Sequence, residues 1–207
     1  KVHPAARETV GYLESLLRHL EAGTPLSALP SIDYEKIADL HLLTAKPVIY
    51  AFNVTEDGLT DTSLQSTLSA LVAPARSLFI CAKIEEELKG LSSGEAAELL
   101  ESYGVKETGL VQLIHAAYDT LGLQSYLTAG PKEVRAWTIR QGWTAPQAAG
   151  VIHTDFERGF IAAQVVDYND LIAAGSEANA RAAGKIRTEG KTYVMQPDDV
   201  VEFRFNV

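Results

Sequence analysis

Apolar residues recur at intervals of three and four along the first part of the chain, a period that predicts helices. A first helix is expected over residues 5–21, with five apolar side chains on one face: Val10, Leu13, Leu16, Leu17 and Leu20. Such a narrow stripe suits either the arm of a helical hairpin or an ordinary surface helix. The same pattern predicts helices over residues 33–44, 63–72, 92–103 and 109–121, and an acidic helix that begins at Ile84.

Two continuous apolar runs interrupt this helical pattern, over residues 48–52 and 78–81. A strand that is buried on both faces of a parallel sheet has this composition. Because a helix is expected after each run, the order strand, helix, strand, helix predicts a parallel α/β arrangement with a crossover connection. The first run ends in a polar turn that begins at Asn53.

The pattern changes near residue 130, where Gly130 precedes Pro131. Beyond this point strands are expected over residues 134–139, 160–166 and 201–207, the last with strict alternation of apolar and polar positions. An alanine-rich helical segment over 170–183 is interrupted at Gly175. We therefore expect a small α+β domain after a boundary near residue 130.

The formal net charge is −9, from 18 basic and 27 acidic residues. This excess of acid disfavours DNA and anionic membranes as partners, since both are polyanions. No apolar run approaches the about 18 residues that a membrane-spanning helix needs. The lone Cys81, expected to be a buried thiol, allows no internal disulfide, so we expect a reducing compartment, the cytoplasm. Since the only methionine is Met195 and the sequence opens at Lys1, we also expect a part of a longer or processed chain.

Polar residues follow both apolar runs at the edge where open parallel sheets bind ligands. Asn53 and Glu56 come after the first run, and Cys81 and Ala82 stand at the end of the second. The Asn53 amide can both donate to and accept from a purine edge, and backbone groups around Val54 can line the base. The alternative is that Asn53 only forms a turn.

A phosphate-binding loop is missing from this sequence. The nearest pattern, over residues 184–192, places five residues instead of four between Gly184 and Gly190, and it lies before a strand rather than before a helix. We expect a turn there. No histidine has metal-ligand spacing, and His153 beside Asp155 is expected to form a structural turn, because the sequence offers them no nucleophile.

The second part of the chain mixes basic and aromatic residues. Aromatic side chains among arginines can stack on unpaired RNA bases; the alternative is a set of core aromatics beneath a solvated surface. The residues concerned are Lys132, Arg135, Arg140, Arg158, Arg181, Lys185, Arg187, Lys191 and Arg204, with Trp137, Trp143, Phe156 and Phe160 among them.

Several segments resemble the YchF family, the Obg-like ATPases. Residues 133–138 (EVRAWT) and 144–160 (TAPQAAGVIHTDFERGF) resemble its TGS domain, and 201–207 (VEFRFNV) its C-terminus. Residues 46–50 (KPVIY) and 53–56 (NVTE) are similar to a strand and the base-recognition motif of its G domain. Residues 123–130 (LQSYLTAG) are similar to the segment that leads into the TGS domain.

The resemblance implies a P-loop NTPase of the translation-factor class. Its fold would combine α/β and α+β parts: a helical coiled-coil arm segment over residues 1–45, the C-terminal part of a G domain over 46–130, and a ubiquitin-like β-grasp TGS domain over 131–207. The phosphate loop, switch segments and Mg²⁺ ligands of such a protein would lie outside this sequence, so this chain alone is expected not to hydrolyse ATP.

The resemblance also implies ATP as the nucleotide, with GTP less favoured. The usual guanine motif is Asn-Lys-x-Asp, and here Val54 and Glu56 stand where the Lys and the Asp would be. Asn53 and Val54 would contact adenine, while Cys81 and Ala82 would line the base pocket. Expected partners are the ribosome, ribosomal RNA or a protein; the alternative function is a stand-alone ribosome-, RNA- or protein-binding module without hydrolysis.

Overall fold

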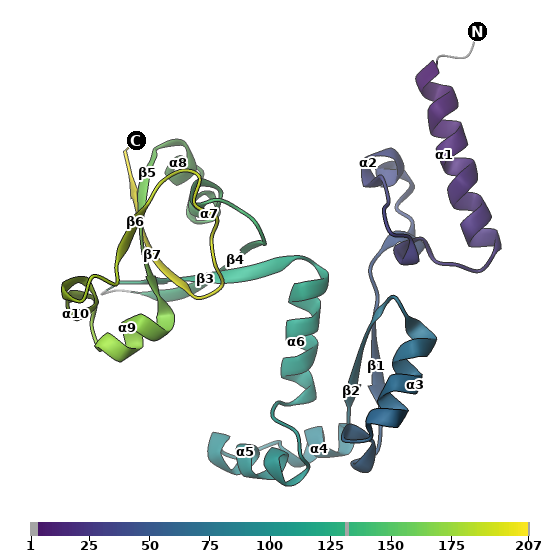
Figure 1. Cartoon of the computed structure of the whole chain (residues 1–207), viewed down its shortest axis with the longest axis horizontal. Coiled ribbons are helices and arrows are strands. Elements are labelled where there is room, and N and C mark those ends of the chain that lie inside the picture. The colour runs from purple at the N-terminus through teal and green to yellow at the C-terminus, as the bar shows by residue number, and fades with distance from the viewer. Residues whose placement is uncertain (1–3, 131–132, 207) are drawn as a thin grey trace. The chain divides into compact units, whose positions relative to one another are not determined.

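The computed structural model describes residues 4–130 and 133–206, and the chain divides into two compact units, residues 1–121 and 122–207. Each is built around its own sheet (Figure 1). The helices of the first unit are α1 (Pro4–Glu21), α2 (Tyr34–Ile37), α3 (Thr62–Val72), α4 (Ala82–Glu87), α5 (Ser93–Ser102) and α6 (Gly109–Thr120). Its short 3₁₀ segments are η1 (Leu26–Ala28), η2 (Ala38–Leu40), η3 (Leu43–Ala45) and η4 (Asp57–Leu59).

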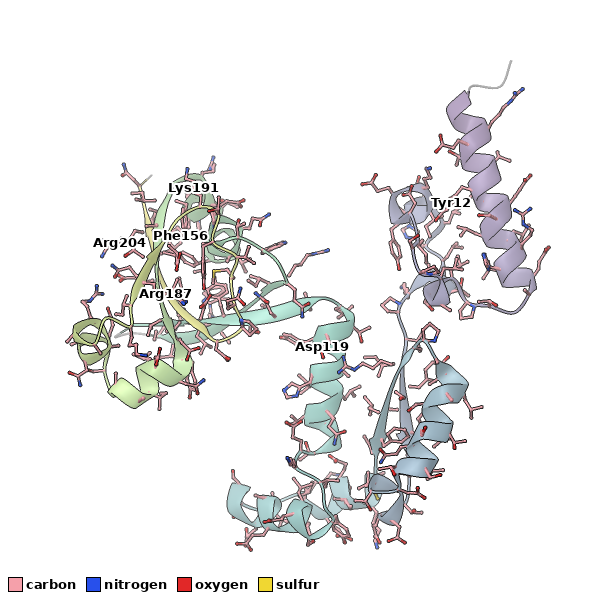
Figure 2. All side chains as sticks on the ribbon, in the orientation of Figure 1. Tyr12, Asp119, Phe156, Arg187, Lys191 and Arg204 are labelled. Carbon is pink, nitrogen blue, oxygen red and sulfur yellow. The ribbon has the colours of Figure 1, made fainter. Side chains whose placement is uncertain are left out.

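Helix α1 confirms the helix predicted over residues 5–21, since its bounds differ from the prediction by one residue. It ends where Gly23 takes a positive φ of 77°, a conformation that glycine adopts without steric cost. The hydroxyl of Tyr12, between α1 and α2 in Figure 2, accepts the backbone N–H of Asp33 at 2.8 Å. Leu16 is buried with Leu26, so the apolar stripe packs on the segment that follows α1.

The single helix predicted over residues 33–44 is wrong. Asp33 caps only the short helix α2, after which the chain passes through η2 and η3. The break lies at His41, whose φ of 47° is left-handed. Its physical reason is burial, because the turn brings Ile37 and Ala45 into the same apolar cluster as α1.

The strands β1 (Ile49–Asn53) and β2 (Arg76–Ile80) pair in parallel, with α3 between them in the chain, which confirms the parallel arrangement. Helices α3 and α6 cover opposite faces of β2. Ser77 contacts Ser69 of α3 at 2.8 Å, while Arg76 forms a 2.8 Å ion pair with Asp119 of α6 (Figure 2). Neighbouring residues of a strand point to opposite faces, so the two contacts place the helices on the two sides.

The expectation that the first apolar run is buried on both faces is wrong in this structure. Val48 and Tyr50 expose 43% and 42% of their surface. The reason is that β1 has only β2 as a neighbour among the described strands. Cys81, predicted as the last residue of the strand over 78–81, instead lies just after β2, at the residue that precedes α4.

The second unit is a mixed five-stranded sheet in the order β4-β3-β7-β5-β6, in which β3 and β7 are parallel and the other neighbours antiparallel. Its strands are β3 (Leu123–Ala129), β4 (Val134–Arg140), β5 (Phe160–Asp167), β6 (Arg187–Glu189) and β7 (Asp199–Phe205). Its helices are α7 (Ala145–Ile152), α8 (Thr154–Arg158), α9 (Tyr168–Ala174) and α10 (Glu177–Ala182).

Each face of this sheet carries its own core. On one face Tyr126, Val165 and Val201 pack under α7. On the other, Val166 and Val200 pack against α9 and α10. Alternation along β5 and β7 thus distributes one strand's side chains between two cores.

The strands predicted after residue 130 are confirmed to within two residues, apart from Val207, which lies outside the described residues. Gly175, with a φ of 73°, separates α9 from α10 as the sequence predicts. The division between the units differs from the expected position near 130. Because β3 pairs with β4 and β7, the second unit begins at Gly122.

Candidate nucleotide-base site

A hollow of about 280 Å³ lies where β1 and β2 end side by side. The parallel register pairs Asn53 with Ile80, so the segments that follow both strands emerge at the same edge of the sheet. The hollow is lined by Asn53, Val54, Thr55, Glu56, Cys81, Ala82 and Lys83. The structure therefore brings together all five residues that the sequence singled out for a purine base.

Asn53 ties the two strand ends to one another. Its Oδ1 accepts the backbone N–H of Ala82 at 3.0 Å, and the N–H of Val54 donates to the carbonyl of Ile80 at 2.8 Å. The Asn53 side chain lies at the surface with its Oδ1 engaged, which leaves Nδ2 as its donor group. Asn53 therefore both stabilises the turn through Oδ1, as the turn-forming alternative predicts, and presents its Nδ2 donor at the hollow.

Glu56 is engaged by a cation that the sequence analysis missed as a partner. Its Oε1 lies 2.5 Å from Nζ of Lys83, and this hydrogen bond raises the pKa of the Lys83 ammonium group. Oε1 of Glu87 lies 4.0 Å from the same ammonium group. In the sequence, the one sign of this ion pair is that Lys83 closely follows the second predicted strand, while the acidic Glu56 closely follows the first. Of the two Glu56 carboxylate oxygens, Oε1 is consequently already engaged.

The floor of the hollow is held by packing beneath it. Cys81 is 5% exposed and packs with Ile84 and Leu100, so the buried-thiol expectation is confirmed. Gly109 begins α6 against the end of β2, and its N–H donates to Oε1 of Glu85 at 2.5 Å. A Cβ at Gly109 would stand 2.6 Å from Cγ2 of Ile80, so glycine permits this close approach.

The other motifs are structural in this fold. His153 ends α7 and caps α8, with Nδ1 accepting the N–H of Asp155 at 3.2 Å. Residues 184–192 form a turn at Gly184 and the short strand β6. Within residues 4–130 and 133–206, no cluster of three or more His, Cys, Asp or Glu side chains is suited to a metal ion. No helix in this part of the chain is long and apolar enough to cross a membrane.

The four aromatic residues singled out among the basic residues belong to the core of the second unit or to its margin. Phe160 is buried, and Trp137, Trp143 and Phe156 pack partly against the same cluster. Several of the basic residues are occupied in ion pairs with neighbouring carboxylates: Arg135 with Glu133, Arg158 with Asp155, Arg181 with Glu177, and Lys185 with Asp170. These contacts favour the core-aromatic alternative over a stacked RNA platform at these positions.

The chain matches known proteins in both sequence and fold. Residues 123–206 match the family model YchF-GTPase_C, described as "Protein of unknown function (DUF933)". The ribosome-binding ATPase YchF of Bacillus subtilis (strain 168) is 50% identical over 176 residues, which cover 83% of this chain and 48% of that protein. The protein of the same name from Escherichia coli O157:H7 is 44% identical over 206 residues, 98% of this chain and 57% of that protein.

The chain belongs to the YchF family. Its fold matches the solved structure of the Schizosaccharomyces pombe YchF GTPase with a TM-score of 0.79 and 36% identity, over 97% of this chain and 55% of that one. The chain spans about half the length of the curated relatives that it matches. The sequence-based recognition of the YchF family is thereby confirmed.

Proposed function

We propose that the first unit supplies the base-binding side of an adenine-nucleotide site in a YchF-type ATPase, and that the second unit is a TGS domain for docking. The observation that carries the proposal is the hollow at the ends of β1 and β2, lined by Asn53, Val54, Glu56, Cys81 and Ala82. Ligands of open parallel sheets bind at the carboxyl ends of the strands. The names of the B. subtilis and E. coli relatives, ribosome-binding ATPase, agree with it.

The chemistry of Asn53 suits a purine such as adenine. An asparagine amide pairs with adenine at N7, an acceptor, and at the N6 amino group, a donor. Since Oδ1 is occupied by the N–H of Ala82, the available pairing is Nδ2 to N7. Val54 and the backbone at Cys81 and Ala82 would enclose the faces of the ring.

The Glu56–Lys83 ion pair disfavours guanine. A guanine site needs a carboxylate that accepts from N1 and N2 of the base, and the Glu56 carboxylate already accepts from Lys83 at 2.5 Å. To accept both guanine donors, Glu56 would have to share or give up the Oε1 contact with Lys83, a cost that adenine does not incur. We propose ATP as the preferred nucleotide, with GTP as the weaker ligand.

Hydrolysis is proposed for the complete nucleotide site, not for these residues by themselves. The residues here fit a base, and they include neither a phosphate loop nor, within the described part, a carboxylate cluster for Mg²⁺. Bound Mg²⁺ would neutralise the charge that develops on the γ-phosphate. This chain's own contribution is to hold and orient the base through Asn53, Val54 and Ala82.

Exchange of Asn53 for aspartate tests the base site. Asn53→Asp keeps an oxygen that accepts the N–H of Ala82 but removes the Nδ2 donor, so adenosine affinity should fall about tenfold, the cost of one good base contact. The measurement is titration of the chain with adenosine, followed by the amide NMR shifts of Val54 and Ala82. Adenosine is the probe because its binding does not depend on phosphate groups.

Asn169→Asp is the matched control, because it introduces the same charge at the surface of the second unit. It should leave adenosine binding unchanged. Equal binding by the unaltered chain and the Asn53→Asp variant would contradict the assignment of Asn53, and the lack of any shift at Val54 and Ala82 would contradict the base site itself.

The second candidate function is ribosome docking without nucleotide hydrolysis. The strand order of the second unit supports the proposed β-grasp TGS domain, since a helix packs across a mixed sheet whose first and last strands are parallel neighbours. If docking belongs to this chain, it should co-sediment with purified ribosomes in nucleotide-free buffer, and added ATP should not change the bound fraction.

Co-sedimentation only in the presence of ATP would contradict independent docking and would favour the nucleotide site as its switch. The control is the same chain centrifuged without ribosomes, which should stay in the supernatant.

A further inference from the structure

The sheet of the second unit splits at one end. Strands β3 and β7 pair at Leu127 and Val200, whereas β7 pairs with β5 along its whole length, from Asp199 to Phe205. Beyond Leu127 the end of β3 separates from β7. A groove of about 460 Å³ opens between residues 128–130 and 201–203.

The walls of this groove are aromatic and half-buried. They are formed by Trp137 of β4, Phe156 of α8 and Phe203 of β7, with Ile152 beside them. Phe156 is labelled in the second unit in Figure 2. Such a surface binds apolar side chains through burial of area rather than through charge.

Each aromatic wall is held by a neighbour. The indole N–H of Trp137 donates to Oγ1 of Thr128 at 2.9 Å. Phe156 stacks on Phe205 with ring centroids 3.7 Å apart, and Phe203 meets Tyr126 edge to face at 5.8 Å. A groove whose side chains are already ordered loses less entropy when a ligand enters, which favours binding.

The charged residues that line the groove are acidic. Its two charged lining residues in the described part of the chain are Glu133 and Glu202. Arg135 pairs with Glu133 at 3.1 Å, and its guanidinium lies over the Trp137 ring, 4.8 Å from the ring centroid, while Glu202 lies at the surface. Carboxylates at the rim attract cationic side chains and repel phosphate groups.

We propose that this groove binds an extended basic peptide segment of a partner protein. An apolar side chain of the segment enters between Trp137 and Phe203, and lysine or arginine residues beside it face Glu202. The side of β7 that diverges from β3 gives the segment a strand along which to lie, as in other cases of peptide addition to a sheet. This inference is independent of the purine site and concerns a different unit.

Fluorescence of Trp137 tests the proposal. The full chain with Trp143→Phe keeps Trp137 as its single tryptophan, and circular dichroism checks that this background variant is folded. The probe is a capped pentapeptide, Lys-Leu-Lys-Phe-Lys, with Glu-Leu-Glu-Phe-Glu as its charge-reversed counterpart. The basic peptide should change the Trp137 emission saturably, and the acidic peptide should not.

Charge reversal at the rim provides the second arm. Glu202→Lys should weaken the basic peptide about fivefold, as expected for reversal of one exposed charge. Glu98→Lys, which makes the same charge change at the surface of α5 in the other unit, should alter the affinity less than about twofold.

Three results would overturn the proposal: equal binding of both peptides, equal binding of the basic peptide by the Glu202→Lys variant, or no response to either peptide. A ten-nucleotide uridine RNA serves as the competing ligand class. If it changes Trp137 emission and displaces the peptide, the groove is an RNA site and the peptide assignment is wrong.

Discussion

Replacement of Gly159 by alanine should destabilise the second unit by about 3 kcal/mol, the upper range for an added methyl group without room. Gly159 separates α8 from β5, and its carbonyl accepts the N–H of Asn206 at 2.9 Å. A Cβ at this position would fall well inside contact distance of the Asn206 carbonyl oxygen. Since that oxygen belongs to the backbone, it cannot turn away as a side chain would, and the end of β7 must shift.

Urea unfolding followed by tryptophan fluorescence measures this effect. The chain has two tryptophans, Trp137 and Trp143, and both lie in the second unit, so the signal reports this unit selectively. Gly190→Ala is the matched control, because a Cβ there would meet nothing within 4 Å. Equal unfolding midpoints for the two variants would show that the β7 end accommodates the methyl group.

Removal of the buried Asp199 carboxylate should have an effect of similar size. Asp199 is 2% exposed, and it accepts the N–H of Gln196 at 2.8 Å and the hydroxyl of Tyr193 at 2.9 Å. Asp199→Ala leaves these donors without a partner inside the fold, so we expect a loss of about 3 kcal/mol. Asp199→Asn keeps one acceptor oxygen and should lose about 1 kcal/mol. The same unfolding measurement compares the two variants.

The pH dependence of stability distinguishes this network from simple packing. Burial raises the pKa of Asp199 above its ordinary value of 3.8, although Gln196, Tyr193 and Arg187 favour the charged form. Over the interval between the ordinary and the raised pKa, the folded chain holds a proton that the unfolded chain has released. This contribution is therefore greatest below pH 3.8 and is lost as the pH rises through the folded-state pKa.

Asp199→Asn removes the titrating group. The free energy of unfolding of the unaltered chain, measured relative to this variant, should decrease as the pH rises through that interval. Burial also raises the pKa of Tyr193 to about 12, so its hydroxyl remains a donor to Asp199 throughout. A difference between the two chains that is constant with pH would contradict a raised pKa at Asp199.

The hydrophobic period by itself determined several of the elements. The stripe over residues 5–21 appears as α1, and the helix predicted over 92–103 appears as α5, which begins with a capping box at Ser92 and Glu95. The alternating strand predicted over 201–207 appears as β7, two residues earlier in the chain. These signals are local, because the hydrophobic period and the capping residues of a helix or strand can be recognised within a short stretch of sequence. The five predicted base-site residues share one hollow for a related reason: Asn53 ends β1, Cys81 directly follows β2, and these two strands pair in parallel.

What only the tertiary structure decided depends on residues far apart in the chain. The break at His41 follows from the joint burial of Ile37 and Ala45, which no local period encodes. Lys83 engages Glu56 across 27 residues, and β3 joins the second unit through strands that come after it. The groove exists because β3 and β7 diverge beyond a single paired position. Contacts of this kind are set by how separate segments pack, so period, charge and spacing along the chain do not contain them.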